Sequence, residues 1–453
     1  MTTARKVAYE LLHAVAADDA YANLLLPNLL RQAKLAPRDS GLAQEIAFGT
    51  LRLQGRYDAI IEIAANRHIA DITLPALLLL RMGCHQLLAM RVGAHAAINE
   101  TVNLAKQVAS HGSAGFVNGC LRRVSERSLG EWLELLEERT SDTFERDAII
   151  NSHPTWIVRA FAKALDQDGI ADQLDSLLQS DNANPVVNLV ALPGLATSAD
   201  TEQLEPSKSS PIGFLLESGD PAKLDAVAGG RVRVQDAGSQ LAALALVAAK
   251  PVGAGETWLD MCAGPGGKAA LLAAEAVQTK SRLVASELQQ HRSDLVRNAL
   301  EPIDPNVEIV TMDARGWGTE YPAEFDRILL DAPCSGLGAL RRRPEARWRK
   351  KPKDIGELSA LQEQLLTSAW QALKPGGVLA YVTCSPHVGE TTSVIEWATR
   401  KFGSEFEQLD TPAVFDRIKP GLPLNRKRKA VQLWPQVHDT DAMFIALITK
   451  SLG

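Results

Sequence analysis

The sequence has little of several features that place a chain in a special class. Its 453 residues include five cysteines, at positions 84, 120, 262, 334 and 384, which form no close metal-binding pair and no disulfide framework. No apolar run approaches the ~18–20 residues that span a bilayer. The first ten residues carry an early glutamate and lack the apolar core of a signal peptide. We therefore expect a cytoplasmic chain with free thiols and no membrane association.

An excess of positive charge is also missing. Lysine and arginine number 48 against 54 aspartate and glutamate, a net charge of −6, so the chain is not coated in basic charge. The charge is unevenly placed, because residues 341–353 (R-R-R-P-E-A-R-W-R-K-K-P-K) hold eight basic residues against one acid. A cluster of this kind can bind phosphates, and the alternative is a solvated surface loop.

The length and the texture of the sequence predict several domains. Residues 1–140 carry helical apolar stripes, which predicts an all-α domain. Residues 141–238 mix a helix with short candidate strands and a polar stretch at 198–211, expected to be an exposed loop, which predicts a small α+β module. Strand and helix signals alternate in residues 239–453. This alternation predicts a Rossmann-like α/β domain with a mostly parallel, seven-stranded sheet and helices on both faces.

A glycine-rich turn follows the first strand of the third region and opens a helix. The turn is L-D-M-C-A-G-P-G-G-K (259–268), and its glycines permit the close approach of a ligand to the backbone. Glu287 ends the next strand, 20 residues after Gly267, where an acid can bind the two ribose hydroxyls of a nucleoside. Asp313 ends the third strand, within reach of an adenine amino group. Together these residues favour an adenosine-containing cofactor over a plain turn with capping acids.

The kind of cofactor is less constrained by these residues. A pyrophosphate is expected with a complete G-x-G-x-x-G, which is absent, whereas S-adenosylmethionine (SAM) has no phosphate and tolerates a looser turn. The helix start and Lys268 could favour its carboxylate or another anion. Spacing alone leaves this choice open. The residues expected to bind the cofactor are Cys262, Ala263, Gly264, Pro265, Gly266, Gly267, Lys268, Glu287, Asp313 and Asp331.

Two of the cysteines follow strands of the same predicted sheet. Cys334 lies in D-A-P-C-S-G and Cys384 in A-Y-V-T-C-S-P, so both are expected to open on one crevice beside Asp331. A thiolate, an acid and a methyl donor suit methylation of carbon 5 of cytosine. Thiolate addition to C6 makes C5 nucleophilic, and an acid at N3 lowers the barrier to addition. Lys268 and a cationic donor would favour the thiolate.

These motifs resemble those of a known family. D-M-C-A-G-P-G-G-K, D-A-P-C-S-G and Y-V-T-C-S-P, in this order, are similar to the cofactor loop and the two cysteine motifs of RNA cytosine-5 methyltransferases of the Nop2/Sun type. The Glu-Asn-Val tripeptide of the DNA enzymes is absent. The resemblance implies SAM as cofactor and Cys384 as nucleophile, with Cys334 assisting breakdown of the covalent adduct and product release. Asp331 and Lys268 complete the expected catalytic set.

The helical region narrows the resemblance. A-I-N-E-T-V-N-L-A-K and G-S-A-G-F-V-N-G-C-L-R-R-V look like the antitermination factor NusB, and this arrangement is similar to the family of bacterial 16S (small-subunit) rRNA cytosine-5 methyltransferases. The family implies 16S rRNA, unassembled or in an early particle, as the partner of a monomer that does not act on DNA. Two departures are Glu287, where relatives more often have Asp, and Gly264, where Ala is common.

Chemistry on a base requires that the base be unstacked, so RNA contacts are expected beside the cysteines. The basic segment follows Cys334 closely, and its tryptophan could stack on a base. The expected RNA contacts are Arg292, Arg341, Arg342, Arg343, Arg347, Trp348 and Arg349. Two other interpretations stay open: an antitermination-like RNA-binding factor with a non-catalytic methyltransferase domain, and methylation of tRNA or another RNA. Amino methylation is disfavoured, because D-A-P-C does not fit the Asn/Asp-Pro-Pro-Tyr/Phe motif of such enzymes.

Overall fold

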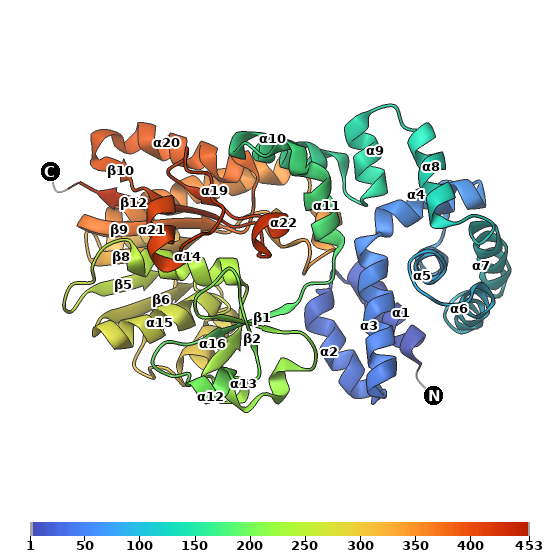
Figure 1. Cartoon of the computed structure of the whole chain (residues 1–453), viewed down its shortest axis with the longest axis horizontal. Coiled ribbons are helices and arrows are strands. Elements are labelled where there is room, and N and C mark those ends of the chain that lie inside the picture. Colours follow the sequence, from blue (N-terminus) through green and yellow to red (C-terminus); the bar gives the residue numbers. More distant parts are fainter. Residues whose placement is uncertain (1–2, 452–453) are drawn as a thin grey trace. The chain divides into compact units, whose positions relative to one another are not determined.

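The computed structural model describes residues 3–451, which divide into two compact units (Figure 1). The helical unit contains residues 3–162, 172–184 and 340–350, and the sheet unit contains residues 163–171, 185–339 and 351–451. The boundary at 162/163 lies inside α10 (Thr155–Asp168). The region 141–238 is thus shared between the units. Within the described residues, no helix is both long and apolar enough to cross a bilayer.

Amphipathic helices build the helical unit around one apolar core. Leu11, Ile46 and Leu79 are fully buried in it, as their spacing on apolar stripes predicts. Polar residues fix helix ends: Ser128 and Glu131 form a capping box at the start of α8. The all-α start is confirmed. The helices are α1 (Ala4–Ala17), α2 (Ala22–Ala33), α3 (Pro37–Arg52), α4 (Gln54–Ala65), α5 (Leu74–Leu88), α6 (Ala94–Val108), α7 (His111–Val124), α8 (Leu129–Glu138), α9 (Thr143–Ile150) and α11 (Leu174–Asn182).

Residues 340–350, with the short helix α18 (Ala346–Arg349), complete the helical unit although they follow most of the sheet unit in sequence. Arg347 is 0% exposed, and its Nη1 donates to the carbonyls of Arg52 (3.2 Å) and Ser152 (2.9 Å). Its Nη2 donates to the carbonyl of Asp181 at 3.2 Å. We call these three oxygens the Arg347 carbonyl site. The guanidinium thereby satisfies backbone acceptors that would otherwise be buried without partners.

The sheet unit contains a small antiparallel sheet of order β2-β3-β1-β4, formed by β1 (Val187–Ala191), β2 (Glu205–Pro206), β3 (Gly213–Leu216) and β4 (Val232–Val234). Two short helices accompany it, α12 (Ser198–Thr201) and α13 (Asp225–Ala228). The expectation of an exposed loop at 198–211 is right for most of its residues, but the stretch includes α12 and β2, and Ser207, Ser209 and Ser210 are buried. The Ser207 hydroxyl accepts the N–H groups of the other two at 3.2 and 3.3 Å, so a local turn satisfies these polar groups inside the fold.

The main sheet has the order β10-β12-β9-β8-β5-β6-β7, with β11 paired to β12. The run from β9 to β7 is parallel and the pairings of β12 are antiparallel, so the predicted mostly parallel sheet is confirmed. The predicted number of seven strands is one too low, because the short β11 adds an eighth. Its strands are β5 (Thr257–Asp260), β6 (Arg282–Glu287), β7 (Glu308–Thr311), β8 (Phe325–Asp331), β9 (Leu373–Thr383), β10 (Phe406–Gln408), β11 (Val431–Gln432) and β12 (Phe444–Lys450).

Helices cover both faces of this sheet, and each face has its own apolar core (Figure 1). Successive strand residues alternate between the cores: Leu329 faces one core, and Ile328 and Leu330 face the other. The first core includes α14 (Ala237–Ala248), α15 (Gly267–Thr279), α16 (Gln290–Leu300) and α21 (Thr411–Ile418). The second includes α17 (Trp317–Glu320), α19 (Pro352–Ala372) and α20 (Thr392–Phe402), and α22 (Pro435–His438) precedes β12.

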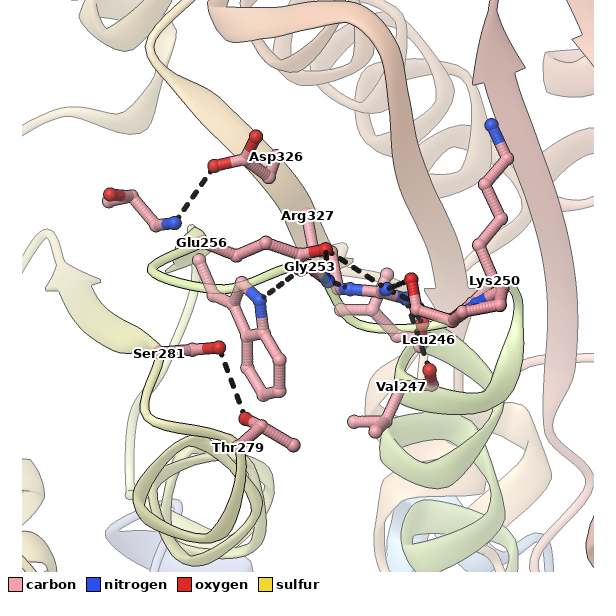
Figure 2. Close-up of polar contacts among 12 residues, drawn as sticks. Leu246, Val247, Lys250, Gly253, Glu256, Thr279, Ser281, Asp326 and Arg327 are labelled. Carbon is pink, nitrogen blue, oxygen red and sulfur yellow. Dashed lines mark hydrogen bonds and ion pairs between the residues drawn. The ribbon is translucent and has the colours of Figure 1, made fainter.

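A buried arginine fixes the amino ends of two central strands. Arg327, near the start of β8, is 2% exposed, and its Nε lies 2.7 Å from Oε2 of Glu256, just before β5 (Figure 2). Its two Nη atoms donate to the carbonyls of Leu246 (2.8 Å) and Lys250 (2.9 Å) at the end of α14. Leu246 lies in the last turn of α14, whose carbonyls have no partner within the helix, and Lys250 lies just beyond its end. One side chain thus joins β5, β8 and α14, and the loops at the opposite strand ends emerge from a fixed framework.

Candidate active site

The carboxyl ends of the parallel strands bring the predicted site residues to one edge of the main sheet. The glycine turn follows β5, Glu287 ends β6, and Asp313 follows β7. Asp331 ends β8, and Cys384 directly follows β9. Neighbouring parallel strands end at the same edge, where open α/β sheets bind their ligands. All these residues belong to the sheet unit.

The two cysteines that follow β8 and β9 lie next to each other. The Sγ atoms of Cys334 and Cys384 are 3.4 Å apart, within hydrogen-bond distance for sulfur. The hydrogen bond shared with Cys334 lowers the pKa of the Cys384 thiol and is the largest cause; Lys268 acts in the same direction, while burial and the charge of Asp331 oppose it. The same hydrogen bond, together with burial, raises the pKa of Cys334 well above its ordinary value. The two thiols therefore differ in acidity, and Cys384 is the more acidic of the pair.

An ion pair lies beside the thiols. Nζ of Lys268, in the first turn of α15, is 2.7 Å from Oδ2 of Asp331. Burial lowers the pKa of Lys268, but the charge and hydrogen bond of Asp331 outweigh burial, so the pKa is raised and the side chain stays cationic. The expected Lys268 cation is thus present at the thiols, and its observed partner is Asp331.

Glu287 and the glycine turn fit each other closely. Oε1 of Glu287 accepts the Gln289 N–H at 3.1 Å, while Oε2 faces the cofactor loop. A Cβ added at Gly264 would lie 2.1 Å from Oε2 of Glu287, so this position has room only for glycine while Glu287 keeps its place. Arg292 lies over the same turn, with Nη2 2.6 Å from the Gly264 carbonyl and Nε 3.5 Å from Glu287. The predicted RNA contact Arg292 therefore binds the cofactor loop.

The other predicted cofactor acid is less enclosed. The side chain of Asp313 is 42% exposed, and its carboxylate is paired with Arg315. The hydrogen bond from Arg315 lowers the pKa of Asp313. The same carboxylate caps the short turn that follows, accepting the Arg315 N–H at 3.0 Å. Asp313 stands at the expected edge, and an adenine amino group would have to share it with Arg315.

Some of the predicted RNA contacts in the basic segment bind backbone carbonyls, and others are exposed to solvent. The prediction that Arg347 contacts phosphate is wrong, because its side chain is buried and binds the three carbonyls of the Arg347 carbonyl site. Burial also lowers its pKa to about 10. Arg349 donates to the carbonyls of Val15 (3.0 Å) and Ala20 (2.7 Å). The remaining members are the buried Arg341, the half-buried Trp348, and the exposed Arg342 and Arg343. Solvent therefore reaches only part of the basic segment.

Two acidic residues of the site were not predicted from the sequence. Asp260, the last residue of β5, is 1% exposed, and its Oδ2 has no hydrogen-bond partner. Burial, aided by the charge of Asp331, raises its pKa to about 7. Its position at a strand end, like that of Glu287, was the signal that could have found it. Glu390, six residues after Cys384, is also fully buried, and its sequence context carries no such signal.

Comparisons with known proteins agree with this geometry. Residues 247–449 match the family described as 16S rRNA methyltransferase RsmB/F, and residues 2–126 match the NusB family. A putative methyltransferase of Mycobacterium tuberculosis is 44% identical, over 99% of this chain and 96% of that protein. The ribosomal RNA small subunit methyltransferase B of Pseudomonas syringae is 34% identical, over 98% and 96%.

A solved structure adds the fold of the whole chain. The crystal structure of the protein PH0851 matches with a TM-score of 0.79 and 20% identity, covering 99% of both chains, a likeness that shows the fold alone. The glycine turn, with no room for a Cβ at Gly264 and with Glu287 at the next strand end, fits SAM, the cofactor of the matched family. The chain belongs to the RsmB/F family of 16S rRNA methyltransferases, and it is a SAM-dependent RNA methyltransferase with a NusB domain.

Proposed function

We propose that this enzyme methylates carbon 5 of a cytidine in 16S rRNA, with Cys384 adding to C6 and Cys334 assisting release. The observation that carries the proposal is the pair of sulfur atoms 3.4 Å apart beside the Lys268–Asp331 ion pair. A relative that is named for methylation of small-subunit ribosomal RNA, 34% identical over 98% of this chain, supports the choice of RNA.

The first step uses the reactivity of Cys384. Its thiolate, favoured by the hydrogen bond from Cys334 and by Lys268, forms a bond to C6 of the base. The electron pair of the C5–C6 double bond moves toward N3, where the Asp331 side chain can hold a proton or a hydrogen bond. The glycine turn, Glu287 and Asp313 are the residues that would hold SAM, which when bound would supply the methyl group for the new bond at C5 and would leave as S-adenosylhomocysteine.

Release reverses the attack. Once C5 carries the methyl group, its proton leaves to a base, the C5–C6 double bond forms again, and the sulfur of Cys384 departs as a thiolate. A thiol that donates a hydrogen bond to this sulfur stabilises the departing thiolate, and Cys334 lies at the required 3.4 Å. The two cysteines therefore divide attack and release between them.

The test is transfer of labelled methyl from SAM to protein-free 16S rRNA that lacks its native modifications, followed by mapping of the modified base. Wild type is compared with Cys384→Ala, and Cys120→Ala is the matched control because Cys120 is buried in the helical unit. We expect one 5-methylcytidine with wild type and control. Cys384→Ala should lose at least ~10³-fold in rate, as expected for removal of a nucleophile.

Other results would redirect the proposal. Transfer to an amino group or to ribose, or full activity of Cys384→Ala, would contradict the C5 chemistry. If SAM binds but naked rRNA is not methylated, small-subunit particles and tRNA are assayed next, and transfer to tRNA alone would contradict the rRNA assignment. Failure to bind SAM would favour a non-catalytic RNA-binding factor.

A further inference from the structure

One buried carboxylate connects the two cysteine loops. Glu390 is 0% exposed, and its Oε1 accepts the backbone N–H of Ser335 at 2.7 Å. Its Oε2 accepts the hydroxyls of Ser335 and of Ser385, the latter at 2.7 Å. Ser335 directly follows Cys334, and Ser385 directly follows Cys384. The carboxylate therefore binds the neighbour of each catalytic sulfur at the same time.

A second layer of buried polar groups holds the carboxylate in place. Gln362, on α19, donates from Nε2 to Glu390 Oε1 at 3.3 Å and to the carbonyl of Pro333 at 2.9 Å. The hydroxyl of Tyr381 donates to the backbone carbonyl of Glu390 at 2.8 Å. Gln362 and Tyr381 are both 0% exposed. The loop that carries Cys334 is thus held through two of its residues, Pro333 and Ser335.

The cost of this arrangement indicates that it does more than fill space. Removing a carboxylate from water is unfavourable unless its oxygens accept enough hydrogen bonds. The donors around Glu390 are neutral serine, backbone and amide groups, which satisfy it without neutralising its charge. A neutral residue could pack in this position at lower cost. A buried carboxylate that is fully hydrogen-bonded to two loops instead fixes the distance between those loops.

We propose that Glu390 is a positioning residue that sets the distance between the sulfur atoms of Cys334 and Cys384 by binding Ser335 and Ser385 together. We call these three residues the Glu390 clamp. The clamp rests on the proposed function for its catalytic meaning, but the spacing of the sulfurs can be measured without RNA. A shift of about 1 Å in a reacting group can cost ~10²-fold in rate, so a clamp behind the thiols is sufficient to govern turnover.

The test uses Glu390→Gln, which keeps the shape but replaces one acceptor oxygen by an NH2 group. The matched control is Glu363→Gln, which removes a charge from α19 without touching either serine. The full-length, RNA-free protein is treated with diamide, and formation of the Cys334–Cys384 disulfide is timed by mass spectrometry. In parallel, kcat, KM for RNA, SAM affinity and the melting temperature are measured.

We expect Glu390→Gln to slow disulfide formation at least tenfold and to lower kcat by roughly 10²-fold, with SAM affinity and KM close to wild type. Glu363→Gln should match wild type in each measurement. Wild-type rates of crosslinking and turnover in Glu390→Gln would overturn the clamp. So would equal losses of SAM affinity and of kcat, because such losses report general unfolding of the site.

Two further variants decide the case if Glu390→Gln does not fold. Ser335→Ala and Ser385→Ala each remove one arm of the clamp, and each should slow crosslinking. Unchanged crosslinking in both would overturn the proposal. Because crosslinking needs no RNA, a slow rate in these variants supports the clamp even if the methylated atom proves different. Loss of turnover with unchanged crosslinking would leave the proposed chemistry intact and remove the clamp.

Discussion

The loop after β8 and the loop after β9 are built alike and behave differently. Each follows a parallel strand, and in each a cysteine is followed by a serine bound to Glu390. Yet the pKa is raised for Cys334 and lowered for Cys384, and in each case the largest cause is the hydrogen bond between them. Of the nearby charges, Glu390 raises the pKa of Cys334, whereas at Cys384 the lowering by Lys268 is opposed by Asp331. Two like residues at one edge thus acquire different acidities from their surroundings.

The largest expected effect comes from removing one of the two thiols. Cys334→Ala leaves Cys384 without the thiol that stabilises it on departure, so the RNA adduct should accumulate and turnover should fall by roughly 10²–10³-fold. The measurement is a protein–RNA band that survives denaturant and labelled methyl on the trapped RNA. Cys334→Ser, which keeps a hydrogen-bond donor, should release part of the adduct. Normal turnover without an adduct would contradict the division of roles.

A second change tests whether the two loops are held as one body. The N–H of Gly338 donates to the Cys384 carbonyl at 2.9 Å, and a Cβ added there would lie 2.0 Å from the Ala442 carbonyl oxygen. Gly338→Ala should therefore destabilise the fold by about 1–3 kcal/mol and lower activity further than stability alone explains. Chemical denaturation and kcat measure the two effects.

Gly356→Ala is the matched control for this change, because an added Cβ there meets no atom within 4 Å. Gly356 lies inside α19, so its replacement should stabilise the fold by about 0.5–1 kcal/mol. A stable, fully active Gly338→Ala enzyme would show that the loops tolerate separation.

Cofactor binding should be separable from both thiols. Glu287→Ala removes hydrogen bonds to the ribose and should weaken SAM binding roughly 10–100-fold by calorimetry, with adduct chemistry at saturating SAM retained. Gly264→Ala should weaken binding too, since its Cβ would displace the Glu287 carboxylate. Glu287→Asp shortens that side chain, so the double variant Gly264→Ala/Glu287→Asp should bind SAM more tightly than Gly264→Ala alone. Additive losses would contradict this coupling.

The smallest expected effect is a displacement of a pH profile. Only the thiolate is alkylated, and the thiolate fraction rises as pH passes upward through the pKa. A free thiol reaches half-maximal alkylation at a pH of about 8.5. Because the pKa of Cys384 is lowered, its alkylation by iodoacetamide should reach half its maximum at a lower pH. Cys334, whose pKa is raised, should react only at higher pH. In Cys334→Ala the profile of Cys384 should move upward, and an unmoved profile would contradict the hydrogen-bond explanation.

The sequence was sufficient to predict the meeting of Lys268, Asp331, Cys334 and Cys384. Local motifs place each at a strand end or a helix start, and parallel strands bring such ends to one edge. The burial of Arg347 was not predictable in the same way. A run of basic residues indicates charge, whereas its partners are backbone carbonyls more than 150 residues away in sequence. Glu390 was missed for a similar reason, because its donors are set by the packing of two loops and α19.

The membership of residues 340–350 in the helical unit has a consequence for synthesis on the ribosome. The Arg347 carbonyl site is formed by residues that precede Asn184, but segment 185–339 must be made before the arginine arrives. At ~5–20 residues per second this delay is roughly 10–30 s. Until Arg347 is synthesised, the three carbonyls lack this partner, and β5 to β8 are made in the meantime. A fragment that ends before residue 340 contains the whole NusB-matched region but lacks the arginine that binds these three carbonyls.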